Sequence, residues 1–388
     1  MRLRSGRAFV TMAAVLAVLG AAPPGFAAAS NMMNANVNHG LTGNGVDQLF
    51  GAIKVCTPGS TTQCQIISGL LLDTGSFGLR IFTQALNIHL PVQTSGTDRI
   101  AECAFFGSLT TWGRIATADV TLAGEPTIPS LPVQIINPNF PLAGSGVANC
   151  SAASGAQIAR SPQQLNFNGI LGVGLMQYDG SFTNYYTCST TGCTQASQPL
   201  ADQVQNPVAL LPVDNNGVLL NFPLPPVSGA AKLTGQLIFG INTEANNQIP
   251  DTFKIYTADA NLNFTTVSRG KTLMGFIDSG SNGFFYDNPA LPKCSGSVWY
   301  CPGALTGQQA TNTGFDGLAT GQVNFDVTNA NNLFATDNAA FFDLGANAVG
   351  SDMFDWGLPF FLGRKVFVGI EGKSISGVSQ STPLWAYK

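Results

Sequence analysis

The chain has 388 residues, of which 10% are charged, and its 17 Lys and Arg against 21 Asp and Glu give a net charge of −4. An acidic chain without a basic stripe is a poor candidate for binding nucleic acid or an anionic membrane surface. Its 44 glycines and 22 prolines favour strands and turns over helices, and its length predicts two separately packed lobes.

Residues 1–29 are typical of a secretory signal peptide and stand outside the predicted fold. Arg2, Arg4 and Arg7 form a basic start, an apolar run follows, and Ala27-Ala28-Ala29 has the small residues of a cleavage site. The apolar run is short for a membrane span, and no later stretch is both long and uncharged enough to be one. We therefore expect an exported protein, periplasmic or extracellular, from a bacterium.

Residues 30–47 are rich in Asn and Gly without periodicity, so we expect a flexible N-terminal arm. Strand patterns begin at residues 51–56 and resume at residues 65–67, with a Pro-Gly turn between them. The sequence predicts a hairpin here, which continues into the apolar run 70–72 and then reaches Asp73.

The most informative feature is a motif that occurs twice. Leu72-Asp73-Thr74-Gly75-Ser76-Phe77-Gly78-Leu79 matches Ile277-Asp278-Ser279-Gly280-Ser281-Asn282-Gly283-Phe284, and each copy follows an apolar run. A single Asp-Thr-Gly-Ser is usually only a turn, because Asp and Gly are ordinary turn formers. Two matched copies are able to face two carboxylates across one cleft, which is the geometry that hydrolysis by a proton-sharing aspartate pair requires.

The rest of the chain repeats the same order of elements. Short strands are predicted at residues 118–122, 132–136, 217–220 and 236–239, which indicates all-β lobes. Residues 167–174 follow the first motif and residues 359–363 follow the second, and each segment has two apolar residues before a glycine. A strand needs such a glycine where it passes close beside another backbone segment. We assign residues 48–245 to an N-terminal lobe and residues 246–388 to a C-terminal lobe.

Eight cysteines lie after the leader, and an even count in an exported protein indicates disulfides. Three pairs are close enough to bridge locally, which leaves the fourth by elimination, although spacing alone does not fix connectivity: Cys56 with Cys64, Cys188 with Cys193, Cys294 with Cys301, and Cys103 with Cys150. Zinc is the competing interpretation. The chain lacks paired CxxC knuckles and has only two histidines, His39 and His89, so we expect no metal.

At these motifs the chain resembles the pepsin-like aspartic peptidases. Four elements match in order: Asp73-Thr74-Gly75-Ser76, residues 167–174, residues 235–240, and Asp278-Ser279-Gly280-Ser281 with its closing Phe361-Leu362-Gly363. The chain is still more similar to a bacterial family of exported proteins catalogued as a domain of unknown function, which shares the ending at residues 354–361. The resemblance implies an all-β fold of two lobes related by a pseudo-two-fold axis, with a central cleft and a flap hairpin over it.

The resemblance also implies roles for single residues. Asp73 and Asp278 would be catalytic, because two carboxyls about 3 Å apart hold one proton over a wide pH range. The residues that follow them would support the pair: Thr74 and Ser279 by hydrogen bonds between the lobes, Ser76 and Ser281 by bonds to the outer carboxylate oxygens, and Gly75 and Gly280 by close approach of the backbone. The flap would hold Phe105, Phe106 and Gly107 in place of the usual tyrosine. Arg80 stands where a tryptophan is usual, and Arg364 stands where an aspartate usually follows the closing glycine.

The sequence thus predicts an exported, metal-independent endopeptidase of the aspartic type. Its partner would be a peptide or protein substrate, and we expect a monomer without a cofactor. One alternative is a pepsin-fold binding or inhibitory protein with little turnover. Another is a glycosidase with two carboxylates roughly 5–10 Å apart, whereas the matched glycine loops favour a closer pair. A Ser-His-Asp triad is a poor alternative, because His39 and His89 are the only histidines in the sequence.

Overall fold

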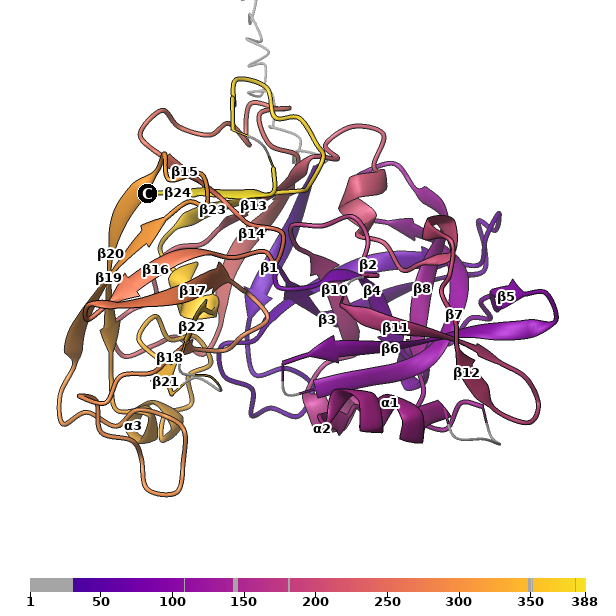
Figure 1. Cartoon of the computed structure of the whole chain (residues 1–388), viewed down its shortest axis with the longest axis horizontal. Helices are drawn as coiled ribbons and strands as arrows, with labels where there is room; N and C mark the ends of the chain where they lie inside the picture. The colour runs from indigo at the N-terminus through magenta and orange to yellow at the C-terminus, as the bar shows by residue number, and fades with distance from the viewer. Residues whose placement is uncertain are drawn as a thin grey trace, which may run out of the picture.

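The computed structural model describes residues 31–107, 109–141, 146–180, 182–347, 350, 352–380 and 382–388, so the predicted signal peptide lies outside the described residues. The described chain is mostly β and forms two sheets (Figure 1). Its helices are short: α1 Gly146–Ser154, α2 Pro162–Leu165 and α3 Ala330–Phe334, with 3-10 turns at Thr83–Ala85, Leu200–Asp202, Pro207–Leu210 and Leu358–Phe360. The all-β prediction is confirmed.

The first sheet has 17 strands, drawn from both ends of the chain. They are β1 Met32–Val37, β2 Leu49–Cys56, β3 Cys64–Asp73, β4 Phe77–Phe82, β5 Thr94–Ser95, β6 Asp98–Phe106, β7 Leu109–Thr121, β8 Ile128–Ile136, β9 Gln157–Ile158, β10 Gly169–Val173, β11 Thr183–Cys188, β12 Cys193–Gln195, β13 Gly217–Asn221, β14 Leu233–Phe239, β15 Lys254–Thr257, β23 Lys365–Gly369 and β24 Leu384–Tyr387. The predicted hairpin strands at residues 51–56 and 65–67 and the four later strands lie in these elements, apart from residue 122, which follows β7.

The second sheet has seven strands and lies on the left in Figure 1. Its strands are β16 Phe264–Ser268, β17 Lys271–Ile277, β18 Phe284–Tyr286, β19 Thr306–Thr313, β20 Thr320–Val327, β21 Gly345–Ala346 and β22 Met353–Trp356. A buried apolar cluster continues from the first sheet into this one, with Leu72, Ile277 and Trp356 among its members. The two sheets therefore share a core.

Six antiparallel strands of the first sheet form a platform that joins the two ends of the chain. Its order is β15–β24–β23–β13–β14–β1. The expectation of a flexible arm is wrong for β1, because this strand pairs along its whole length with β14, from Met32 opposite Ile238 to Val37 opposite Leu233. Met33, Ala35 and Val37 are buried in alternation with Asn34 and Asn36, so one face of β1 belongs to the core.

Two three-strand units carry the repeated motifs. In the first, β10 runs parallel to β3 and antiparallel to β4, which places Gly172 opposite Asp73. In the second, β22 runs parallel to β17 and antiparallel to β18. The counterpart of the first apolar-apolar-glycine element is therefore not Phe361-Leu362-Gly363 but Asp355-Trp356-Gly357, because Trp356 pairs with Ile277 and its carbonyl accepts from Asp278 N–H at 3.1 Å. Arg364 therefore does not follow the glycine next to Asp278, and its comparison with the aspartate that usually follows that glycine no longer applies.

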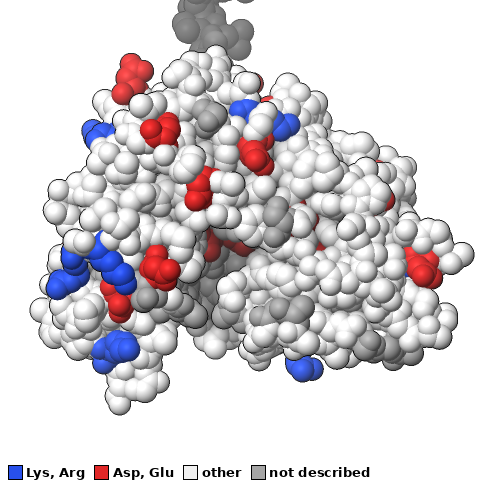
Figure 2. Space-filling model, in the orientation of Figure 1, with Lys and Arg blue, Asp and Glu red and all other residues white. Residues whose placement is uncertain are grey.

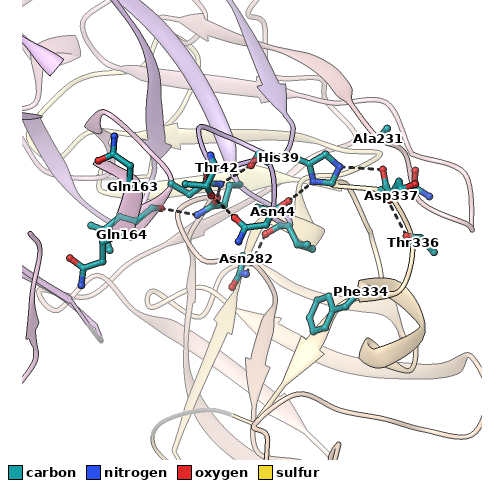
Figure 3. Close-up of a pocket in the computed structure, with 17 residues that line it drawn as sticks. His39, Thr42, Asn44, Gln163, Gln164, Ala231, Asn282, Phe334, Thr336 and Asp337 are labelled. Carbon is teal, nitrogen blue, oxygen red and sulfur yellow. Dashed lines mark hydrogen bonds between the residues drawn. The ribbon is translucent and has the colours of Figure 1, made fainter. Parts of the chain in front are cut away.

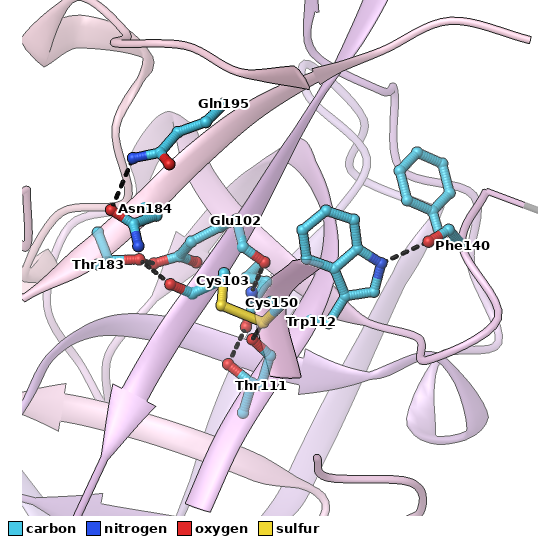
Figure 4. The surroundings of a disulfide bond; sticks show 10 residues. Glu102, Cys103, Thr111, Trp112, Phe140, Cys150, Thr183, Asn184 and Gln195 are labelled. Carbon is cyan, nitrogen blue, oxygen red and sulfur yellow. Dashed lines mark hydrogen bonds between the residues drawn. A yellow bond between two sulfur atoms is a disulfide. The ribbon is translucent and has the colours of Figure 1, made fainter. Parts of the chain in front are cut away.

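All eight cysteines are paired as the spacing suggested: Cys56–Cys64, Cys103–Cys150, Cys188–Cys193 and Cys294–Cys301. The Cys103–Cys150 bridge closes the longest loop, with a separation of 47 residues, and ties β6 to α1. Figure 4 shows it beside the Trp112 ring, whose Nε1–H donates to Phe140 O. Disulfides of this kind are typical of proteins in oxidising compartments. Among the described residues, no helix is long and apolar enough to cross a membrane.

Candidate active site

Asp73 and Asp278 come together where the two three-strand units meet. Asp73 is the last residue of β3, and Asp278 directly follows β17. The loops after them cross-link through reciprocal hydrogen bonds: Thr74 N–H donates to Ser279 Oγ at 3.1 Å, and Ser279 N–H donates to Thr74 Oγ1 at 2.9 Å. Each hydroxyl in turn donates to the strand that carries the opposite aspartate, Thr74 to Ile277 O at 3.3 Å and Ser279 to Leu72 O at 2.8 Å.

The two carboxylates have matching hydrogen-bond partners. Gly75 N–H donates to Asp73 Oδ1 at 2.8 Å, and Gly280 N–H donates to Asp278 Oδ1 at 2.7 Å. The hydroxyl of Ser76 donates to Asp73 Oδ2, and that of Ser281 donates to Asp278 Oδ2 at 2.9 Å. The inner oxygen of each carboxylate thus faces a backbone amide, and the outer oxygen faces a serine.

The glycines hold the carboxyls face to face. A Cβ added to Gly75 would lie 2.5 Å from Asp278 Cγ, and one added to Gly280 would lie 2.7 Å from Asp73 Oδ1. Each loop therefore presses its glycine against the opposite aspartate, at a distance that leaves no room for a side chain. Replacement of either glycine would force the two carboxyls apart.

The pair is built to hold one proton. Burial, the nearby charge of Asp278 and a hydrogen bond between the two carboxyls raise the pKa of Asp73 well above its usual value, against the lowering effect of Ser76 and Gly75. Asp73 is 6% exposed. Two carboxyls in contact cannot both ionise cheaply, so one remains protonated while the other is charged.

A third carboxyl, which the sequence motifs did not single out, lies beside the pair. Asp355 sits in β22, two residues before Gly357, and its Oδ1 is buried without a hydrogen-bond partner. Burial and the charge of Asp278 raise the pKa of Asp355 well above its usual value, with a smaller contribution from Asp73, while a hydrogen bond with the Ser281 hydroxyl lowers it. A lone Asp between two aromatic residues, Phe354 and Trp356, is the sequence signal that could have identified it.

Two cavities adjoin the aspartate loops. One of about 250 Å³ touches Thr74 and Gly75 and is lined mostly by apolar side chains, among them Leu175, Phe182, Phe276 and Met353. A larger one, of about 930 Å³, lies on the flank of the second loop at Asn282, between residues 39–48, α2 and the segment after α3 (Figure 3). His39 bonds there to the backbone carbonyls of Gly45 and Asp337. Neither aspartate lines either cavity, but the smaller one is lined by the residues next to both of them, Thr74 after Asp73 and Ile277 before Asp278, so it is the better candidate for a substrate side chain.

The predicted flap is the hairpin of β6 and β7, with Gly107 at its turn in a left-handed conformation, φ +44°. Phe105 and Phe106 are half-buried. Phe105 packs on the cluster around the Cys103–Cys150 bridge, and Phe106 packs on a cluster with Phe82 and Phe167. Neither ring lines the cavity beside Thr74 and Gly75.

Arg80 is buried and joins this hairpin to the first aspartate loop. Its Nη2 bonds to Glu102 Oε1 in β6 at 2.5 Å and to Asp179, and its Nη1 donates to Phe77 O at 2.6 Å. Burial lowers the pKa of Arg80, but the charges of Glu102 and Asp179 outweigh it and raise the value overall. Burial and the charge of Glu102 raise the pKa of Asp179 well above its usual value. Arg80 therefore forms a buried ion cluster that connects the hairpin to the Asp73 loop.

Metal ligation has little support in the part of the chain that the structure describes, where no group of three or more His, Cys, Asp or Glu side chains is placed to hold an ion. The face of the molecule in Figure 2 is sparsely charged, and acidic atoms lie in the hollow between its two sides. The arrangement offers a proton-sharing carboxyl pair beside an apolar cavity. That combination is suited to acid–base attack by water on a carbonyl group.

Comparison with known proteins places this site in a family without an assigned activity. No curated protein matches the chain. A family model described as "Protein of unknown function (DUF3443)" matches residues 27–387. The chain belongs to this family.

Proposed function

We propose that the protein is an exported aspartic-type endopeptidase with a pepsin-like fold, in which two β-lobes each contribute one aspartate. The reciprocal bonds between Thr74 and Ser279 carry this proposal, because they tie two matched loops into one symmetric unit around Asp73 and Asp278. Two unrelated turns are not expected to form the same hydrogen bond in both directions, from the backbone N–H of each loop to the hydroxyl of the other. Four disulfides and the predicted leader support an oxidising, exported location.

The chemistry needs only the two carboxyls and a water molecule. The ionised aspartate takes a proton from the water as its oxygen bonds to the scissile carbonyl carbon, and the protonated aspartate gives its proton to the carbonyl oxygen. The tetrahedral species then collapses as the C–N bond breaks: the proton taken from water passes to the leaving nitrogen, and one hydroxyl of the gem-diol returns a proton to the other aspartate, which restores the pair. Gly75 and Gly280 hold the inner carboxylate oxygens in place during both steps.

The surroundings favour peptide over sugar. A carboxyl pair in hydrogen-bond contact is too close to flank a glycosidic bond, which takes carboxyls roughly 5–10 Å apart. The cavity lined by Leu175, Phe182 and Met353 suits an apolar side chain next to the scissile bond.

A second candidate is a binding or inhibitory protein that keeps the cleft but turns over slowly. The hairpin favours it, because Phe105 and Phe106 pack on core clusters and present no hydroxyl toward a substrate. In that case, partner binding would be unchanged by Asp73→Asn and Asp278→Asn.

The first experiment incubates the mature protein with a quenched peptide library from pH 3 to 7.5, with and without a statine-type transition-state analogue. Asp73→Asn and Asp278→Asn are compared after circular dichroism has shown that they are folded. We expect cleavage that the analogue inhibits and that both variants lose. A folded wild type that cleaves nothing, or cleavage that survives in either variant, contradicts the proposal.

A further inference from the structure

The two three-strand units differ in one side chain close to the aspartates. Ile170 of β10 lies opposite Leu71, and Asp355 of β22 lies opposite Phe276. Leu71 and Phe276 each precede an aspartate of the pair by two residues, so Ile170 and Asp355 occupy equivalent places. Ile170 is 1% exposed and packs in an apolar cluster. A carboxyl therefore replaces an apolar side chain on the Asp278 side alone.

The backbone holds Asp355 tightly beside the second aspartate loop. Asp278 N–H donates to Trp356 O at 3.1 Å, and Leu358 N–H donates to Ser281 O at 2.7 Å. A Cβ added to Gly357 would lie 2.1 Å from Gly283 O, which shows how closely the two segments pass. Asp355 is thus fixed on both sides by contacts to the loop that carries Asp278.

The hydrogen-bond partners of Asp355 suit a neutral acid. The Ser281 hydroxyl bonds to Asp278 Oδ2 at 2.9 Å and also interacts with Asp355, and with one proton it can donate fully to only one of the two carboxyls. Asp355 Oδ1 has no partner and is buried. An ionised Asp355 would compete with Asp278 for the Ser281 proton and face a second negative charge, whereas a protonated one can donate its own O–H to Ser281 Oγ and leave the serine proton to Asp278. The raised pKa of Asp355, caused first by burial and then by Asp278, agrees with the neutral form.

Among the described residues near β22, no other charged group stabilises the ionised form of Asp355. Asp278 and Asp73 are the charged neighbours that act on Asp355. On β18 the titratable residue is Tyr286, whose ring stacks on Phe354, and side chains alternate along a strand, so it lies on the other face of β22. On β17 the titratable residue is Lys271, at the opposite end of the strand from Ile277.

We propose that Asp355 is a positioning residue of the aspartate pair: as a neutral acid it donates to Ser281 Oγ, which commits the Ser281 proton to Asp278, and its ionisation sets the upper pH limit of activity. This inference rests on the proposed function for its catalytic consequence. Its electrostatic part, a carboxyl that stays neutral beside Asp278, stands on the structure independently of turnover.

The test compares Asp355→Asn, Asp355→Ile and Asp352→Asn. The Asn variant still donates to Ser281 but cannot ionise, the Ile variant copies Ile170 and cannot donate, and Asp352 is an exposed carboxylate next to β22 that controls for net charge. We expect Asp355→Asn to extend the alkaline limb of the kcat/KM profile by at least about one pH unit. We expect Asp355→Ile to lower kcat by about tenfold or more with KM little changed, and Asp352→Asn to match the wild type.

Urea unfolding from pH 4 to 8 provides a second readout that needs no activity. A carboxyl whose pKa is raised by folding makes the protein less stable as pH rises from the unfolded value through the folded one. Asp355→Asn should therefore reduce the slope of unfolding free energy against pH by the equivalent of up to one bound proton, and Asp352→Asn should leave the slope unchanged. An Asn variant with the wild-type pH profile and the wild-type slope overturns the inference. If the wild type cleaves nothing but Asp355→Asn still shows the reduced slope, the proposed function is refuted while the neutral Asp355 remains supported.

Discussion

The buried cluster around Arg80 offers the strongest test of how the flap hairpin is held. Arg80→Met removes the cation that forms salt bridges with Glu102 and Asp179, and Glu102 is 0% exposed. Loss of one partner from a buried ion pair costs about 3–5 kcal/mol of unfolding free energy, because a buried charge is left without compensation. The carbonyl of Phe77, next to the Asp73 loop, also loses its donor. We expect a loss of stability in this range.

Urea unfolding of the wild type, Arg80→Met and Arg160→Met at pH 3.5 and 7.5 measures the effect. Without Arg80, the two acids are favoured in their neutral forms, so the loss should grow as pH rises above about 4. Addition of Glu102→Gln and Asp179→Asn to Arg80→Met should restore part of the stability. Arg160 is exposed, and its variant should stay within about 0.5 kcal/mol of the wild type. A loss for Arg80→Met below about 1 kcal/mol, or one equal at both pH values, would refute this reasoning.

Three further predictions concern the site and its support. Gly75→Ala, whose Cβ would lie 2.5 Å from Asp278 Cγ, should lower kcat by about 100-fold or more while circular dichroism stays native; near-wild-type kcat would show that the carboxyls can shift without harm. Thr74→Val with Ser279→Ala removes both reciprocal bonds and should cost about 2–4 kcal/mol in urea unfolding, and a cost equal to that of Thr313→Val with Thr320→Ala, whose hydroxyls form an exposed hydrogen bond, would contradict the assigned role. Cys103→Ser with Cys150→Ser opens the 47-residue loop and should cost about 2–5 kcal/mol, a prediction that fails if melting is unchanged while mass spectrometry confirms loss of the bridge.

Local patterns made much of the fold predictable. Alternating apolar residues and turn chemistry identified the hairpin of β2 and β3 and the strands β13 and β14, because these signals act within a few residues. The repeated Asp motif located both aspartate loops for the same reason. β1 escaped notice although Met33, Ala35 and Val37 alternate with asparagines, since the many Asn and Gly residues around it suggested a coil.

What depended on distant contacts was not predictable. Arg80 is 22 residues from Glu102 and 99 from Asp179, so no local pattern links them. The second glycine element was misplaced because Phe361-Leu362-Gly363 fits an apolar-apolar-glycine pattern, whereas the segment that occupies the equivalent place, Asp355-Trp356-Gly357, does not, and only strand pairing identifies it. The role proposed for Asp355 depends on its proximity to Asp278, which results from the pairing of β22 with β17 and is not visible in the sequence.

The platform of β1, β13, β14, β15, β23 and β24 sets the order in which the chain can complete its fold. β1 leaves the ribosome first, yet its main partner β14 follows some two hundred residues later, as the bond from Asn31 to Phe239, 208 residues apart, illustrates. β23 and β24 arrive last. Pairings across such distances form slowly, because the intervening loop must close before any contact stabilises it. The platform therefore stays incomplete until β23 and β24 join it, so the sheet that links both ends of the chain closes late in folding.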